Sequence, residues 1–254
     1  MHNVESLPML LKELRLCAFG RHWEEHQKIA LDKQLMPGQY LASLCSLEVA
    51  ARYERRIRRM LKDACLPVGK SVESLNFREF KGIKKTQINK FTNNSSWAER
   101  AENIFLFGPS GAGKTHIASA VGSALVERGV RVKFWSATEL VQQLQKAKEQ
   151  LVLFDTLNKL DRYAVLIVDD IGYVKKGERE SQVLFELIAH RYETGSMIIT
   201  SNQPFSEWDQ IFGDKMITVA AIDRLVHHAT VFDFTREDSY RRKQALKRKS
   251  AQKG

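Results

Sequence analysis

Residues 108–115 combine glycines, a lysine and a threonine at spacings suited to binding a polyphosphate. Their sequence, Gly-Pro-Ser-Gly-Ala-Gly-Lys-Thr, fits the pattern G-x-x-x-x-G-K-[ST] and stands between an apolar run, 103–107, and a helical pattern that starts at Lys114. The glycines let backbone N–H groups approach phosphate oxygens, and the helix adds its positive end. Lys114 is suited to the β- and γ-phosphates and the Thr115 hydroxyl to Mg²⁺. The sequence therefore predicts a site for ATP or GTP rather than a chance glycine-rich loop.

Two carboxylates follow the apolar run 164–168. A buried central strand that ends in Asp169 and Asp170 places both at the carboxyl edge of a sheet, where open α/β proteins bind ligands. Asp169 is the natural partner of Mg²⁺, and Asp170 is placed to polarise an attacking water. A turn with two solvated acids is the alternative.

Asn202 follows the next apolar run, 197–200. Its amide could hydrogen-bond a γ-phosphate or the lytic water. Ser201 and Asn202 are also ordinary turn residues. The interpretation therefore depends on the place of Asn202, directly after the strand that follows the one ending in Asp169 and Asp170.

Arg224 lies in a helical segment just before the last expected strand. A guanidinium there could stabilise charge on the γ-phosphate held by a neighbouring subunit, or it could simply pair with Asp223. His227 and His228 follow, but the sequence offers no third ligand at metal spacing, which favours a structural or interfacial role.

Strands and helices alternate from residue 103 onward, which predicts an α/β fold with a five-stranded parallel sheet covered on both faces. The strands are expected at 103–107, 130–135, 164–168, 197–200 and 230–234. The helices are expected at about 114–128, 138–150, 179–193 and 215–228.

The N-terminal part reads as a small all-helical domain, with helical patterns near 7–14, 21–34 and 39–66. The last pattern carries an expected apolar stripe of Leu41, Leu44, Cys45, Val49 and Tyr53. We expect four regions: a helical domain at 1–68 that contacts DNA or a partner, a linker arm at 69–102, an ATPase domain at 103–240 and a basic tail at 241–254. Phe77, Phe80 and Phe91 are the expected anchors of the arm.

The chain of 254 residues carries a formal net charge of +10, which attracts polyanions such as nucleic acid. The basic residues gather in clusters, although a solvated helix face remains an alternative for the N-terminal one. The candidate DNA contacts are Arg52, Arg55, Arg56, Arg58, Arg59, Lys175 and Lys176.

No run approaches about 18 apolar residues, and charged residues interrupt the N-terminus, so we expect neither a membrane span nor a signal peptide and place the protein in the cytoplasm. The three cysteines, Cys17, Cys45 and Cys65, lack any C-x-x-C pair and are expected to be reduced core thiols.

Four stretches together resemble the IstB family, AAA+ ATPases that assist transposition of one class of bacterial insertion sequences. They are the phosphate loop continuing into His116, the turn at 169–173, the stretch 199–208 and the run 223–229. The helicase loader DnaC shares the loop and acid motifs, but Ser-Glu-Trp at 206–208 and Asp-Arg-Leu-x-His-His at 223–228 look more like IstB. The resemblance covers nearly the whole chain and is most specific from about 100 to 242.

The resemblance implies an AAA+ fold, ATP bound between subunits of an oligomer, and a helper that deforms target duplex DNA and recruits or stimulates its transposase. By the family pattern Asp169 holds Mg²⁺, Asp170 activates water, Asn202 is sensor 1 and Arg224 is the arginine finger. AAA+ proteins usually have Glu where Asp170 stands, which suggests slow, regulatory hydrolysis. The residues assigned to the nucleotide are Gly108, Pro109, Ser110, Gly111, Ala112, Gly113, Lys114, Thr115 and His116.

Little or no lid domain is expected, because only about twenty residues follow the fifth strand; Arg241 or Arg242 could serve as sensor 2. Two other functions stay open. A helicase loader would use the same ATPase chemistry on a protein partner, and a small-molecule kinase would use the same phosphate loop but would not explain the basic tail.

Overall fold

The computed structural model describes residues 4–77, 83–174, 177–212 and 214–234. The chain separates into two compact units, Met1–Arg59 and Met60–Gly254, and the division falls within the helix α3 (Pro37–Ala64).

The first unit consists of helices around a small core. A short 3-10 turn, η1 (Val4–Ser6), precedes α1 (Leu7–Glu13) and α2 (Cys17–Asp32), and α3 begins at Pro37, where a fixed φ suits the first turn of a helix. Leu11, Phe19 and Leu44 form the core. The three helices confirm the expected helical character of this region.

The apolar stripe expected on α3 is wrong in its register. Leu44 is buried, but Leu41, Val49 and Tyr53 are exposed. The buried positions of α3 in this unit are Leu44 and Glu48, four residues apart, which places them one turn apart on the same face. All three cysteines are exposed, so the expectation of core thiols is also wrong.

A buried carboxylate fastens α3 to the start of α2. Glu48 accepts hydrogen bonds from the Ala18 backbone N–H at 2.6 Å and from Arg52 Nε at 2.9 Å. Burial by itself would raise the pKa of Glu48, but the hydrogen bonds from Arg52 and from the Ala18 and Phe19 backbones lower it below its ordinary value. The first unit is therefore held by a polar contact as well as by its small apolar core.

The second unit is built on a five-stranded sheet in which all neighbouring strands are parallel, in the order β2-β3-β4-β1-β5. The central strands β1, β3 and β4 are wholly buried, as their continuous apolar runs predict, whereas β2 and β5 lie at the edges and are more exposed. The expected parallel α/β sheet is confirmed, and no strand end is shifted by more than two residues. The strands are β1 (Asn103–Phe107), β2 (Val132–Ser136), β3 (Val165–Asp169), β4 (Ser196–Ser201) and β5 (Ala229–Asp233).

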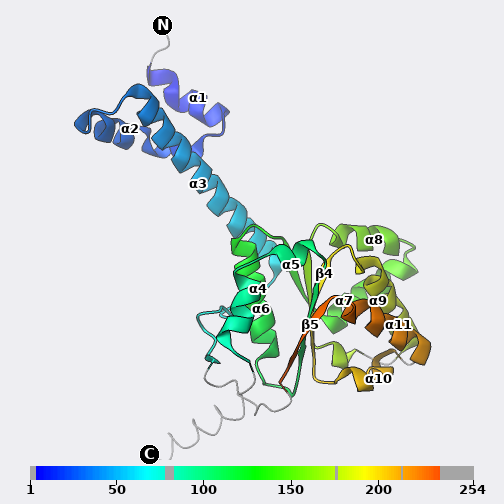
Figure 1. Cartoon of the computed structure of the whole chain (residues 1–254). Coiled ribbons are helices and arrows are strands. Elements are labelled where there is room, and N and C mark those ends of the chain that lie inside the picture. The colour runs from blue at the N-terminus through cyan, green and yellow to red at the C-terminus, as the bar shows by residue number, and fades with distance from the viewer. Residues whose placement is uncertain (1–3, 78–82, 175–176, 213, 235–254) are drawn as a thin grey trace, which may run out of the picture. The chain divides into compact units, whose positions relative to one another are not determined.

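Helices cover both faces of this sheet (Figure 1). The helix α6 (Lys114–Glu127) packs with α4 (Lys85–Thr92) on one face. On the other face, a large apolar cluster joins Phe105, Leu166 and Ile199 to a second group of helices. That group is α7 (Ala137–Glu149), α8 (Leu153–Leu160), α9 (Glu178–Arg191), α10 (Asp209–Phe212) and α11 (Lys215–Val226). None of the described helices has the length and apolar character needed to cross a bilayer.

The structure also contains short helices that sequence periodicity did not predict. The helices α4 and α5 (Ser96–Glu99) lie in the expected linker arm, and α8 and α10 lie in expected loops. Each has at most eight residues, too few for a clear helical period. Phe91 of α4 packs edge-on against Trp97 and against Phe232 of β5, which is the anchoring contact expected of it. Phe80 lies outside the described residues.

Candidate functional site

The loop between β1 and α6 requires glycine at positions where its backbone is unusual or crowded. Gly113, the residue before α6, has φ of 96°, and Gly108 has φ of 146°. A Cβ added to Gly108 would lie 2.6 Å from the Phe234 Cβ and 2.9 Å from the Phe234 carbonyl carbon. The loop therefore turns tightly against the end of β5, as expected for a loop that wraps its backbone around an anion.

Lys114 is held inside this loop. Its side chain is buried, and Nζ donates hydrogen bonds to the carbonyl oxygens of Gly108 at 2.8 Å and Pro109 at 3.1 Å. The chain thus fixes an ammonium group at the N-terminus of α6, which is the positive end of the helix dipole. This arrangement suits a strongly negative ligand.

Thr115 and Asp169 meet at the carboxyl ends of β1 and β3. The Thr115 hydroxyl donates to Asp169 Oδ2 at 3.0 Å. Two neighbouring oxygen ligands of an octahedral Mg²⁺, each bonded at about 2.0–2.1 Å, lie about 2.9 Å apart. The two oxygen atoms are therefore spaced as Mg²⁺ would need them, and the residues fit the metal implied by the phosphate loop.

Thr200 is a member of the site that the sequence did not reveal. Its hydroxyl, wholly buried at the end of β4, donates to Asp169 Oδ1 at 2.7 Å and accepts from the Asp170 backbone N–H at 2.8 Å. It therefore fixes the orientation of one acid and the backbone of the other. The only signal in the sequence was a polar residue at the end of an apolar strand, which is too common to identify a role.

Asp170 sits in a strained turn that points it toward the loop. It has φ of 59° and ψ of 51°, a left-handed conformation that aspartate tolerates better than most residues. Its side chain is half-buried and helps to line a cavity of about 160 Å³ beside the phosphate loop. The lining consists of Lys70, Ser110, Gly111, Gly113, Lys114, Thr115, His116 and Asp170.

Lys70 and His116 also line this cavity. His116 Nε2 lies 2.8 Å from the Ser74 hydroxyl and 3.3 Å from the Ser71 carbonyl oxygen, so the segment before the sheet is fastened to the start of α6. Burial lowers the pKa of His116 below its ordinary value, and Lys70 lowers it further against the opposing effect of the Ser71 carbonyl. Sequence reasoning missed Lys70, because no local pattern links it to the loop.

Asn202 lies beside the acid turn rather than in the cavity. Its amide oxygen lies against Gly172, where a Cβ would overlap it, and its side chain is exposed. Among the described residues, the lining of the cavity includes Asp170 and omits Asn202. The structure therefore brings Asn202 next to the turn formed by 170–173.

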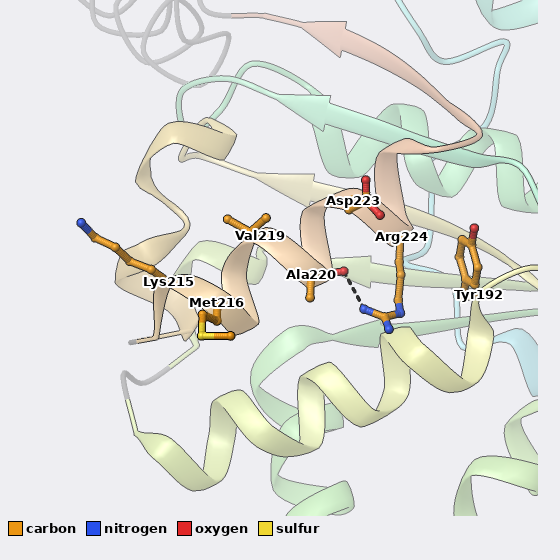
Figure 2. Close-up of a pocket in the computed structure, with 7 residues that line it drawn as sticks. All are labelled: Tyr192, Lys215, Met216, Val219, Ala220, Asp223 and Arg224. Carbon is orange, nitrogen blue, oxygen red and sulfur yellow. Dashed lines mark hydrogen bonds between the residues drawn. The ribbon is translucent and has the colours of Figure 1, made fainter.

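Arg224 lies on α11, in a groove separate from the phosphate cavity. Its Nη1 donates to the Ala220 carbonyl at 2.9 Å, and its guanidinium carbon stands 5.2 Å from the centre of the Phe185 ring. Arg224 and Tyr192 line a groove of about 560 Å³ and lie side by side (Figure 2). Met216 and Val219, further along α11, line the same groove and are exposed. Neither Asp223 nor Arg224 lines the phosphate cavity of the same chain, within the described residues.

The candidate DNA contacts on α3 differ in their surroundings. Arg52 and Arg55 each form an ion pair with the buried Glu48, at 2.9 and 3.1 Å. Arg56, Arg58 and Arg59 are exposed on the same helix. The remaining candidates, Lys175 and Lys176, and the possible sensor 2 residues Arg241 and Arg242 lie outside the described residues.

Nearly the whole chain matches a known family. Residues 9–249 fit the model of the IstB-like ATP binding proteins. The chain belongs to the IstB family. It is 45% identical over 98% of its length to a putative insertion sequence ATP-binding protein of Sinorhizobium fredii, 84% of which is covered. It is 36% identical over 97% of its length to the putative ATP-binding protein of insertion sequence IS21 from Pseudomonas aeruginosa, 91% of which is covered.

Solved structures share the fold of about two thirds of the chain. The helicase loader DnaC aligns with a TM-score of 0.55 at 18% identity, over 66% of this chain and 98% of that chain. DnaA of Aquifex aeolicus, bound to AMPPCP, aligns with a TM-score of 0.57 at 18% identity, over 70% of this chain and 53% of that chain. At these identities the likeness establishes the AAA+ fold. Together with the family, it makes the protein an ATP-binding AAA+ ATPase.

Proposed function

We propose that this IstB-family protein is a helper of transposition that uses ATP to assemble on duplex DNA, deforms it, and recruits or stimulates a partner transposase. The relatives named as ATP-binding proteins of insertion sequences support the biological setting. The net charge of +10 supports a polyanionic partner. The assignment of individual residues rests on the geometry of the site.

The phosphate cavity is suited to the triphosphate of ATP with Mg²⁺. Lys114 would neutralise the β- and γ-phosphates, and Thr115 with Asp169 would hold the metal ion, which neutralises charge on the phosphate oxygens. Asp170 would orient the attacking water and accept its proton. Its side chain is one methylene shorter than the usual glutamate, so we expect slow turnover suited to regulation.

The observation that carries the proposal is the separation of Arg224 from this cavity. Arg224 lines a groove on α11, on the sheet face opposite α6, whereas the phosphate loop opens at the start of α6. A guanidinium that is needed at the γ-phosphate would then have to come from a second copy of the chain. ATP would join two copies, and its hydrolysis would release them.

Assembly would also explain how a surface with only a few arginines on each copy could bind DNA. One copy offers a few exposed arginines on α3, and several copies side by side would multiply their affinity through effective concentration. Among the candidates, Arg56, Arg58 and Arg59 are better placed than Arg52 and Arg55, which already pair with Glu48. Asn202, beside the acid turn, would report which nucleotide is bound.

Light scattering and duplex-DNA binding, each with and without ATP, test the proposal. We expect ATP to convert small species into larger assemblies, and to strengthen salt-sensitive binding to duplexes of unrelated sequence. The Lys114→Ala variant is the matched control and should do neither. A wild-type chain that stays monomeric with ATP and ignores duplex DNA would contradict the proposal.

A helicase loader remains the alternative, but the likeness to DnaC concerns the fold alone. The two functions differ in their main ligand. A loader would bind a hexameric helicase tightly and duplex DNA poorly, so a side-by-side measurement of both affinities separates them.

A further inference from the structure

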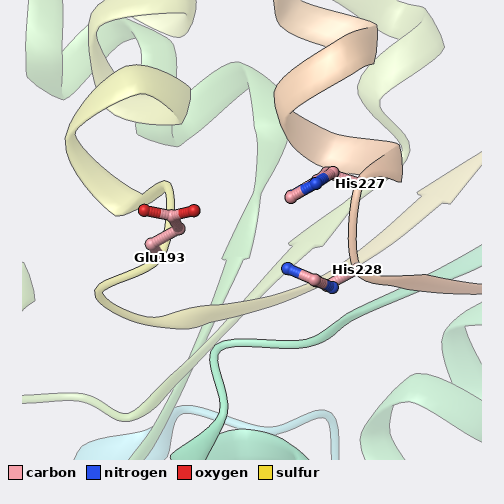
Figure 3. A group of neighbouring side chains, drawn as sticks. All are labelled: Glu193, His227 and His228. Carbon is pink, nitrogen blue, oxygen red and sulfur yellow. The ribbon is translucent and has the colours of Figure 1, made fainter.

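The fold brings together three side chains that the sequence keeps apart. Glu193 stands in the turn between α9 and β4, and His227 and His228 stand between α11 and β5 (Figure 3). Each offers one ligand atom, and these atoms lie within 4.8 Å of one another. No residue close in the sequence offered the histidine pair a third ligand, because Glu193 reaches it only through the tertiary structure.

We propose that Glu193, His227 and His228 bind a transition-metal ion of the zinc type, at a site separate from the Mg²⁺ position beside Asp169. Two imidazoles and one carboxylate are a ligand set typical of Zn²⁺, whereas Mg²⁺ prefers oxygen ligands alone. Ligand atoms bound at about 2.0–2.1 Å in a tetrahedral site lie about 3.4 Å apart. The three side chains thus need a small closing movement, which exposed side chains can make.

The turn that carries Glu193 is held in place by hydrogen bonds of the buried Arg191. Arg191 is 2% exposed, and its guanidinium donates to the carbonyl oxygens of Tyr163, Ala164 and Ser196 at 3.0–3.2 Å. The Thr194 and Gly195 backbone N–H groups bond the Arg191 carbonyl, and Glu193 has a left-handed φ of 58°. A ligand on such a turn loses little freedom on binding a metal ion.

A neighbouring tyrosine orients one of the imidazoles. The Tyr192 hydroxyl lies 3.2 Å from His227 Nδ1, which leaves Nε2 as the nitrogen available to a metal ion. Metal-binding histidines commonly use their second nitrogen in this way.

A bound ion would connect the turn after α9 to the junction of α11 and β5. Tyr192 also lines the groove that contains Arg224, so the metal site and the groove share a side chain. The three ligands are exposed, so the ion would keep water in its open positions, and a partner could replace that water. The inference does not depend on the proposed role of Arg224.

Calorimetric titration of the untagged, metal-free full chain with ZnCl₂ in excess Mg²⁺ tests the site. We expect about one high-affinity equivalent per chain, and an affinity at least about tenfold weaker in each of His228→Ala and Glu193→Gln. Co²⁺ should give the visible absorption of a tetrahedral or five-coordinate ion in the wild type, and lose it in both variants. All substituted residues are exposed, so the variants should fold, as circular dichroism would verify.

Two controls separate this site from other zinc-binding groups. His22 and Glu25 form an exposed pair on α2 at 3.5 Å but are not part of a described three-ligand cluster, so His22→Ala should leave zinc binding unchanged. Cys65→Ser tests an exposed thiol in the same way. Zinc binding that survives both cluster substitutions, or a wild-type chain that does not bind zinc, would overturn the proposal.

Discussion

The phosphate cavity and the exposed face of α11 belong to the same domain but are built in different ways. The cavity is built on a loop of fixed conformation and the first turn of a helix, and the Asp169 carboxylate beside it accepts hydrogen bonds from Thr115 and Thr200. The α11 face is made of side chains that extend from exposed positions, with Met216 83% exposed. The first is built from groups that contact one another within one chain, whereas the second presents Met216 and Val219 to solvent.

The largest expected effect tests whether Arg224 of one copy of the chain reaches the phosphate cavity of a second copy. We expect Arg224→Ala to lower ATP turnover about 10³-fold, the scale of an arginine finger, while each chain still binds ATP. Phosphate release and fluorescent-nucleotide binding measure the two properties. Arg179→Ala, on the exposed surface of α9, is the control.

Mixing variants sharpens the same test. An equal mixture of Arg224→Ala and Lys114→Ala chains contains intact phosphate loops on one kind of chain and intact arginines on the other. If the site forms between copies, random pairing would restore about a quarter of the sites. A mixture as inactive as its separate components would place Arg224 outside a shared site.

Lys114→Ala tests the cavity by itself. Removing a buried ammonium that faces phosphates should weaken ATP binding about 10²–10³-fold, because the loop carbonyls would then face the anion uncompensated. Lys159→Ala, on α8, is the control. Equal ATP affinity in both variants would refute the assignment of the loop.

Asp170→Asn separates binding from chemistry in the same cavity. Asparagine tolerates the left-handed backbone of this position, so the change removes the charge without straining the turn. We expect ATP affinity within about threefold of the wild type and turnover lowered about 10²-fold, the usual contribution of a general base. Wild-type turnover would exclude Asp170 from the chemistry.

Thr200→Val should have the smallest effect. The change removes the hydroxyl that orients Asp169 and keeps the side-chain volume. We therefore expect Mg²⁺ to bind more weakly, so that half-maximal turnover needs about tenfold more Mg²⁺. Thr218→Val, which removes another buried hydroxyl on α11, should leave the Mg²⁺ requirement unchanged. An unchanged requirement in both variants would make Thr200 purely structural.

The parts of the protein that the sequence predicted are those with strong local patterns. The strands with continuous apolar runs and the helices of 12 residues or more in the second unit were placed to within a few residues. The short helices α4, α8 and α10 were missed, and the buried face of α3 was misplaced. A short helix has no period to recognise, and the face that a long helix buries depends on what packs against it.

The sequence by itself determined the phosphate loop, the acid turn and the alternation of strands and helices along the chain, because each depends on neighbouring residues and on backbone conformation. The tertiary structure alone decided that Thr200 holds Asp169, that Lys70 borders the cavity, that Arg224 lies in a separate groove and that Glu193 joins His227 and His228. These contacts join residues distant in the chain, and their distances are set by how the sheet and its helices pack.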